Sequence, residues 1–183
     1  MKYILIVAFV LAGCTPVKVS NFEMETVGGW DLDGKRVELK NLPHQRFALN
    51  FYSPTCVPCV KELPALNFLH GQLSGNEVAV YIAVDPYVIV ENDAGTLASV
   101  VEEATAIMKK EVVSRQIKLP VIILDKKIVG QDGLVTGTPE TLLLETRPLS
   151  LYYNFIGAIT EEQNPAKISQ DNKVKFLTKM LGR

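Results

Sequence analysis

Two cysteines, Cys56 and Cys59, are the residues of this sequence whose type and spacing best suit chemistry. They enclose Val57 and Pro58, so the thiols are close neighbours along the chain. Thiols at this spacing can form and reopen a disulfide, and they can also bind a soft metal ion. The pair therefore predicts either a redox site or part of a metal site.

The segments beside the pair predict where its sulfurs lie. Residues 47–52 are an apolar run typical of a buried strand, and residues 60–69 carry apolar side chains at helical spacing. The pair would then lie at a strand-to-helix turn, with Cys56 at the positive end of the helix dipole. This position exposes a sulfur and favours its thiolate. We therefore expect Cys56 to be the nucleophile and Cys59 to be the shielded thiol that releases the product.

Strand and helix patterns alternate along the rest of the chain. They predict a hairpin over residues 28–39, a doubly buried strand over 78–84, a helix over 95–114, a strand over 119–124, a strand pair over 141–144 and 149–155, and a last helix over 171–181. Residues 85–96 show no strong pattern and are interpreted as a loop. This order predicts one α/β domain, in which helices flank a central mixed β-sheet with an N-terminal β-hairpin extension.

The start of the chain predicts export. Residues 3–11 are apolar and uncharged, but the run is much shorter than the roughly 20 residues that cross a bilayer. Small residues follow, which predicts a signal peptide over 1–13; a buried strand or helix of a cytosolic domain is the alternative. The tetrad Leu11-Ala12-Gly13-Cys14 resembles the lipobox of bacterial lipoproteins. That resemblance implies a lipid on Cys14 as the mature N-terminus, a tether over 14–22 and one domain over 23–183.

Cysteine count and charge limit the function further. If Cys14 carries a lipid, only one pair of cysteines remains, which is too few for a framework of structural disulfides. The 19 basic and 20 acidic residues are interspersed along the sequence and leave a net charge of -1. Nothing in this pattern predicts nucleic-acid binding or a polybasic membrane surface.

Four motifs resemble those of the TlpA/ResA/CcmG-like family of thioredoxin-fold proteins, the membrane-tethered reductases of cytochrome c maturation. They are Leu-Asp-Gly-Lys at 32–35, Cys-Val-Pro-Cys-Val-Lys-Glu-Leu-Pro at 56–64, Gly-Thr-Pro-Glu-Thr at 137–141 and Gly-Ala-Ile-Thr at 157–160. The resemblance implies a thioredoxin-like fold over almost the whole mature chain. It also implies a thiol:disulfide oxidoreductase that binds no organic cofactor and uses Cys56 and Cys59 as a redox-active disulfide.

The resemblance assigns roles to residues outside the pair. Glu62 would accept the proton of Cys59 when that thiol attacks; a solvated carboxylate on the helix surface is the alternative. Thr138 would pair with the substrate backbone, beside a cis Pro139 that faces the cysteines. An ordinary trans-proline turn is the alternative there.

Other residues bear on specificity. Val57 and Pro58 would contact the substrate, and this pair resembles that of reductants rather than strong oxidants. The family often has a tryptophan before the first cysteine, where this chain has Thr55. Residues 144–148 also lack the Asp-x-x-Gly turn of the family. Trp30 is interpreted as a packed aromatic residue of the N-terminal hairpin.

The resemblance implies partners as well. An apocytochrome c with an oxidised Cys-x-x-Cys-His site would be the substrate, and an integral-membrane thiol protein of the CcdA/DsbD kind would supply electrons. Both would meet the enzyme outside the cytoplasm, where a lipid anchors it, with the inner membrane favoured. A general periplasmic disulfide oxidase or isomerase would use the same two sulfurs and stays open as an alternative.

Metal binding and peroxidase chemistry are less well supported. Structural zinc normally has four ligands, but the only histidines, His44 and His70, have no metal-binding neighbour at useful spacing. A thioredoxin-fold copper chaperone would resemble a Cys-x-x-x-Cys site with a distant histidine, a pattern that this chain lacks. A peroxidase would need threonine in place of Ser53 and proline in place of Leu49. We therefore expect no metal at the cysteine pair.

Overall fold

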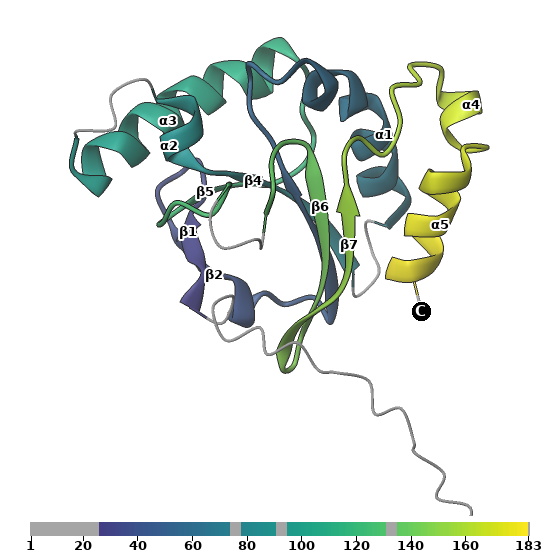
Figure 1. Ribbon diagram of the computed structural model, residues 1–183, viewed down its shortest axis with the longest axis horizontal. Helices are drawn as coiled ribbons and strands as arrows, with labels where there is room; N and C mark the ends of the chain where they lie inside the picture. The colour runs from purple at the N-terminus through teal and green to yellow at the C-terminus, as the bar shows by residue number, and fades with distance from the viewer. Residues whose placement is uncertain (1–25, 74–77, 91–94, 131–134, 183) are drawn as a thin grey trace, which may run out of the picture.

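The computed structural model describes residues 26–73, 78–90, 95–130 and 135–182, and one mixed sheet organises them (Figure 1). In chain order, its strands are β1 (Gly28–Trp30), β2 (Arg36–Glu38), β3 (Arg46–Phe51), β4 (Val78–Val84), β5 (Val121–Leu124), β6 (Glu140–Thr146) and β7 (Leu149–Ile156). Across the sheet they lie in the order β2-β1-β5-β4-β3-β6-β7. The neighbours β3, β4 and β5 are parallel, and the pairings on both sides of them are antiparallel.

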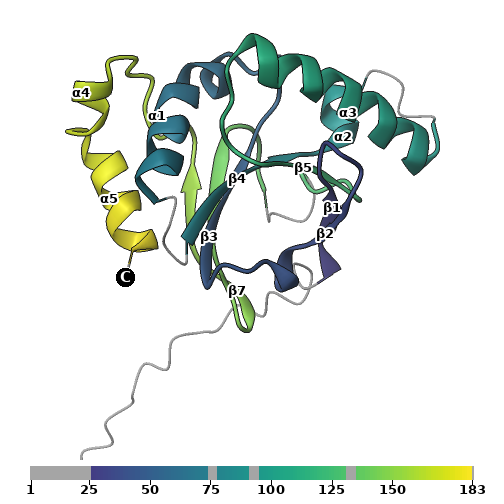
Figure 2. The same ribbon diagram turned by 180° about the vertical axis from the view of Figure 1, so that it is seen from behind.

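The main helices cover one face of this sheet. The helices are η2 (Leu39–Asn41), α1 (Val57–Leu73), α2 (Pro86–Ile89), α3 (Leu97–Ser114), α4 (Pro165–Ile168) and α5 (Asn172–Leu181). The connections β3-α1-β4 and β4-α3-β5 step across the sheet in the same direction, and right-handed crossovers of that kind place both helices on the same face. Figures 1 and 2 show α1, α3, α4 and α5 in an arc over that side.

Both faces of the central strands are buried. Along β4, Val80 and Ile82 pack into the core beneath the helices, whereas Ala79 and Tyr81 pack into a second core on the opposite face. That second core includes Leu39 of η2. Every residue of β4 is buried, which confirms the doubly buried strand predicted from its continuous apolar run.

Helix α1 begins directly after Cys56 and carries the rest of the cysteine motif. Pro58 stands in its first turn, where backbone N–H groups have no partner within the helix, so proline costs little there. Pro64 lies inside the helix and cannot donate to the carbonyl of Val60. The helix continues to Leu73, so Pro64 does not end it.

The predicted fold class is confirmed, and the long elements lie close to their predicted ranges. β1 and β2 form the N-terminal hairpin, which extends the sheet beyond β5. A tight turn at Arg147–Pro148, whose peptide bond is cis, joins β6 to β7 in place of the Asp-x-x-Gly turn. The predicted signal peptide (1–13), the tether (14–22) and Cys14 lie outside the described residues.

The interpretation of residues 85–96 as a loop is wrong over its first part, where α2 forms one short turn of helix. Asp85 caps this helix, because one carboxylate oxygen accepts from the backbone N–H of Tyr87 at 3.0 Å. The other oxygen accepts from the backbone N–H groups of Ile128 and Val129, at 2.8 and 3.0 Å. The signal for α2 was an aspartate followed by proline, a typical helix start.

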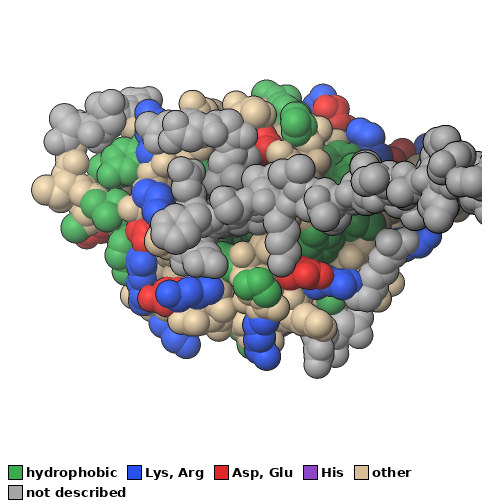
Figure 3. Space-filling model, turned by 60° about the horizontal axis from the view of Figure 1, so that its bottom comes forward, with side chains coloured by type: hydrophobic (Ala, Val, Ile, Leu, Met, Phe, Trp, Pro, Cys, Tyr) green, Lys and Arg blue, Asp and Glu red, His purple; other side chains and the backbone are tan. Residues whose placement is uncertain are grey.

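In the described part of the chain, none of the helices combines the length and hydrophobicity needed to cross a membrane. On the face shown in Figure 3, the basic and acidic side chains of the described residues are interspersed, as they are along the sequence.

Candidate active site

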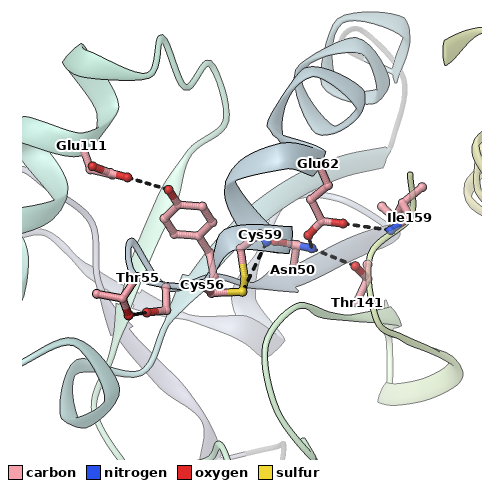
Figure 4. Close-up of a disulfide and its surroundings, with 10 residues drawn as sticks. Asn50, Thr55, Cys56, Cys59, Glu62, Glu111, Thr141 and Ile159 are labelled. Carbon is pink, nitrogen blue, oxygen red and sulfur yellow. Dashed lines mark hydrogen bonds between the residues drawn. A yellow bond between two sulfur atoms is a disulfide. The ribbon is translucent and has the colours of Figure 1, made fainter. Parts of the chain in front are cut away.

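Cys56 and Cys59 form a disulfide at the N-terminal end of α1, with an S–S distance of 2.05 Å (Figure 4). Cys56 is half-buried and Cys59 is fully buried, so the sulfur of Cys56 is the more accessible of the two. The backbone N–H of Cys59 donates to Sγ of Cys56 at 3.2 Å. A helix N-terminus and an N–H donor both stabilise negative charge on this sulfur, as the predicted nucleophile requires.

The surface beside the disulfide contains exposed side chains that a substrate can touch. The side chain of Val57 is 64% exposed, although valine is apolar. Thr55, at the place where a tryptophan was expected, is exposed and exchanges a hydrogen bond with Ser53 at 3.0 Å between the hydroxyl oxygens. Pro58, in the first turn of α1, is half-buried. Thr55 therefore places a small polar side chain directly before Cys56 instead of the expected tryptophan.

The Thr138–Pro139 peptide bond is cis, as predicted. β6 begins at the next residue, and its first residue, Glu140, pairs with Phe51 at the end of β3. The cysteine loop follows that end of β3, so the register brings the proline loop to the same edge of the sheet. The carbonyl of Pro139 accepts from the backbone N–H of Gly157 at 3.0 Å, which fixes the loop from its other side.

Glu140 holds the same loop by its side chain, a function that sequence reasoning missed. The carboxylate is fully buried. One oxygen accepts from the backbone N–H and the hydroxyl of Thr136, both at 2.8 Å, and the other accepts from Nδ2 of Asn154 at 2.8 Å. These bonds fix both ends of the segment that contains Thr138 and Pro139. A carboxylate directly after the proline, at the start of a buried strand, was the available signal.

Glu62 is fully buried on the sheet-facing side of α1, as Cys59 is, so the alternative of a solvated surface carboxylate is wrong. Its Oε1 accepts from Nδ2 of Asn50 and its Oε2 accepts from the backbone N–H of Ile159, both at 2.9 Å (Figure 4). Burial raises the pKa of Glu62 to about 7, because removal from water disfavours the charged carboxylate. The two donated hydrogen bonds act in the opposite direction.

Comparison with known proteins assigns this site to a family. The chain is 33% identical to the thiol-disulfide oxidoreductases ResA of Bacillus thuringiensis (strain Al Hakam) and Bacillus anthracis, over 135 residues that cover 73% of this chain and 67% of each relative. It belongs to the ResA family of thiol-disulfide oxidoreductases. This confirms both the predicted family and the predicted enzyme class. No protein-family model matches the chain.

Solved structures confirm the thioredoxin-like fold of this ResA-family protein. A thiol:disulfide interchange protein from Bacteroides sp. superposes with a TM-score of 0.59 at 16% identity, covering 86% of each chain. The thioredoxin domain of a thiol-disulfide oxidoreductase from Bacteroides vulgatus gives 0.58 at 15% identity, covering 86% of this chain and 94% of that one. StoA from Bacillus subtilis gives 0.51 at 18% identity, covering 78% and 96%.

The ResA-family motif at residues 157–160 acquires a structural meaning that the sequence did not provide. Gly157 donates its backbone N–H to Pro139, and Ile159 donates its backbone N–H to Glu62. One short segment after β7 therefore contacts both the proline loop and the buried carboxylate. The sequence analysis also did not identify Asn50 as a site residue. The available signal was a polar residue inside the otherwise apolar run of β3.

A buried carboxyl group with a pKa of about 7 suits proton exchange at neutral pH. Glu62 lies three residues after Cys59 on the same buried side of α1, which is a neighbouring position on a helix. The arrangement therefore provides an accessible sulfur, a shielded sulfur and a group that can take up or return a proton. The catalytic roles of these residues stay predictions.

The remaining candidates lie outside this group. His44 packs against Tyr81, with 6.0 Å between ring centroids, and burial lowers its pKa. His70 is in the last turn of α1. The guanidinium of Arg36 lies 4.8 Å from the ring centroid of Trp30, so this tryptophan is packed within the hairpin as predicted. Within the described ranges, no group of three or more histidine, cysteine, aspartate or glutamate side chains could hold a metal ion.

Proposed function

We propose that this protein reduces protein disulfides outside the cytoplasm, and that an oxidised Cys-x-x-Cys-His site of apocytochrome c is its substrate. The observation that carries the proposal is the buried carboxyl of Glu62, one turn behind the buried thiol of Cys59. Reduction needs Cys59 to lose its proton as it attacks, and Glu62 can accept one near neutral pH. Membership of the ResA family of thiol-disulfide oxidoreductases supports this chemistry.

The reduced protein would act in two exchange steps. The Cys56 thiolate attacks a sulfur of the substrate disulfide, which breaks that bond and forms a mixed disulfide; the released substrate thiolate takes a proton from water. Cys59 then passes its proton to Glu62, and its thiolate attacks Sγ of Cys56. The Cys56–Cys59 bond forms, the mixed disulfide breaks, and two electrons have moved to the substrate.

Regeneration needs an electron donor on the same side of the membrane. We propose an integral-membrane thiol protein of the CcdA/DsbD kind, which would reduce the Cys56–Cys59 disulfide by the reverse exchange. No organic cofactor is required, because the cysteine pair in its reduced dithiol form carries both electrons. A lipid on Cys14 would anchor the protein outside the cytoplasm, with the inner membrane favoured. The lipobox-like tetrad supports this anchor.

The reduction potential tests the direction of electron flow. A value near or below about −270 mV would support a reductant, whereas a value near about −120 mV would instead support a general disulfide oxidase. The measurement is equilibration with glutathione or dithiothreitol buffers, read by alkylation of free thiols. An isomerase would instead be recognised by its ability to reactivate ribonuclease whose disulfides have been scrambled.

A trapping variant tests the substrate. With Cys59→Ser, the mixed disulfide through Cys56 cannot resolve and should accumulate with an oxidised Cys-x-x-Cys-His peptide. The matched control peptide keeps the cysteines and replaces the histidine with alanine. Equal capture of both peptides would contradict specificity for apocytochrome c, and capture of neither would contradict Cys56 as the nucleophile. The doubly substituted Cys56→Ser, Cys59→Ser protein gives the background.

A further inference from the structure

Asn50 occupies a central position in the buried polar group behind the cysteines. It is fully buried near the end of β3, and its Nδ2 donates to two acceptors: Oε1 of Glu62 at 2.9 Å and Oγ1 of Thr141 at 2.9 Å (Figure 4). Thr141 is its direct partner across the β3–β6 pairing. One amide group therefore connects the carboxyl on α1 with the strand that follows Pro139.

The other end of this amide explains its orientation. Oδ1 of Asn50 is buried and accepts no hydrogen bond in the described structure. If the amide turned over, Oδ1 would face the carboxylate of Glu62, and both N–H groups would lose their acceptors. Buried N–H groups without acceptors are rarer and costlier than under-satisfied carbonyls. The amide is therefore held as a donor toward Glu62.

We propose that Asn50 is a positioning residue for the proton acceptor: Thr141 orients its amide, and the amide holds the carboxyl of Glu62 in place and favours its ionised form. A carboxylate is a stronger acceptor than a carboxylic acid, so protonation of Glu62 weakens the bond from Asn50. The proposal rests on the role of Glu62 in the proposed function. In this proposal the hydrogen bond from Asn50 stabilises the charged form of Glu62. It thereby counteracts the effect of burial, which by itself would keep the carboxyl protonated.

The surroundings of Glu62 make this contribution measurable. From β3 it accepts from the neutral amide of Asn50, which also binds the hydroxyl of Thr141 on β6, and from the segment after β7 it accepts from a backbone N–H. Lys61, the residue before Glu62 on α1, pairs with Glu161 at the exposed surface, with 3.0 Å between them. Cys56 and Cys59 do not titrate while they form a disulfide. In the oxidised protein, Glu62 can thus be titrated without them.

The decisive variant is Asn50→Leu in the full chain. Leucine has the same branched shape as asparagine and is somewhat larger, so it keeps the core filled while it removes both the donor and the unpartnered oxygen. The carboxyl carbon of Glu62 is followed by NMR during a pH titration of the oxidised protein. Loss of a hydrogen bond to the charged form should raise the pKa of Glu62 by about one pH unit. An unchanged or lowered pKa would overturn the proposal.

Asn154 gives a matched control. It is the other amide of the described residues whose buried Oδ1 has no partner, and its Nδ2 donates to Glu140 instead. Asn154→Leu should leave the pKa of Glu62 unchanged, and an equal rise would show that the effect is not specific to Asn50. If Asn50→Leu does not fold, the same titration of Glu62 is made with Thr141→Val. Loss of the orienting hydroxyl should raise the pKa of Glu62 by less than one pH unit, and no rise would overturn the proposal.

A kinetic measurement separates this proposal from the proposed function. Cys56 is loaded with thionitrobenzoate, and release of that thiol by Cys59 is followed across the pH range. A rise of about one pH unit in the pKa lowers the ionised fraction of Glu62 near neutral pH about fivefold, so release in Asn50→Leu should slow by that factor and recover at high pH. A raised pKa with an unchanged rate would support the role of Asn50 and overturn Glu62 as the proton acceptor. A loss that is equal at all pH values would reduce Asn50 to a purely structural residue.

Discussion

The buried carboxyl of Glu62 should make the stability of the oxidised protein depend on pH, and Glu62→Gln tests this directly. Glutamine keeps the size and shape of the side chain but is neutral at every pH. Its amide N–H₂ must point at one of the two donors that now face the carboxylate, Nδ2 of Asn50 or the backbone N–H of Ile159. This donor–donor contact costs about 1–3 kcal/mol at acidic pH, where the wild-type carboxyl is neutral too.

The sign and size of the pH effect follow from the raised pKa. Burial moves the pKa of Glu62 from 4.5 to about 7. Between these values the folded protein retains a proton that the unfolded chain has lost, so stability falls as pH rises. The contribution of this group is complete below the unfolded pKa and is lost as pH increases through the folded pKa. At about 1.4 kcal/mol per pH unit, the loss is about 3 kcal/mol.

Urea unfolding of both oxidised proteins at several pH values between about 4.5 and 8 measures the effect. The other carboxylates titrate equally in the two proteins, so the difference isolates Glu62. At the lowest pH, Glu62→Gln should have a smaller free energy of unfolding than the wild type. By the highest pH, the free energy of unfolding of Glu62→Gln should have risen by about 3 kcal/mol relative to that of the wild type. Glu161→Gln, at the exposed ion pair with Lys61, should change stability by less than about 1 kcal/mol throughout. A difference between Glu62→Gln and wild type that stays constant with pH would refute the reasoning.

Three further predictions concern the loop, the surface and the anchor. Glu140→Ala should destabilise the protein by about 2–4 kcal/mol in urea, because the donors of Thr136 and Asn154 lose a buried acceptor; wild-type stability would contradict the anchoring role. Val57→Asp should change stability by less than about 0.5 kcal/mol but raise KM for a disulfide peptide, since this side chain is 64% exposed beside the sulfurs; an unchanged KM would exclude Val57 from the contact surface. Cys14→Ser should move the protein from the membrane to the soluble fraction and remove an acyl modification by mass spectrometry; membrane retention would contradict the lipid anchor.

The fold class was predictable from local patterns because its long strands and helices carry a clear hydrophobic signal. β4 is a continuous apolar run, and α3 repeats its buried residues at helical spacing. The short helix α2 escaped prediction although Asp85-Pro86 is a typical helix start, because part of its stabilisation comes from a contact distant in sequence. α2 is fixed by Asp85, whose second oxygen binds the segment at residues 128 and 129. No local pattern reports such a contact.

The site was predictable only in part, and the division has a physical cause. Two cysteines before a helix identify a redox motif by themselves, because the helix dipole acts locally. The burial of Glu62 could not be read from its position, because its partners Asn50 and Ile159 lie 12 and 97 residues away in the sequence. The cis Thr138–Pro139 bond came from the family resemblance alone. Spacing along the chain cannot show which distant strand faces a residue.

Two buried carboxylates lie beside the cysteine site, and they have different hydrogen-bond partners. Glu140 accepts three hydrogen bonds, two of them from Thr136 in its own loop, so its side chain fixes that loop. Glu62 accepts one bond at each oxygen, from groups on β3 and after β7, and burial raises its pKa to about 7. Its carboxylate thus has lone pairs left for a proton and lies on the side of α1 that carries Cys59. One carboxylate fixes the loop beside the disulfide, and the other can take up the proton that disulfide exchange releases.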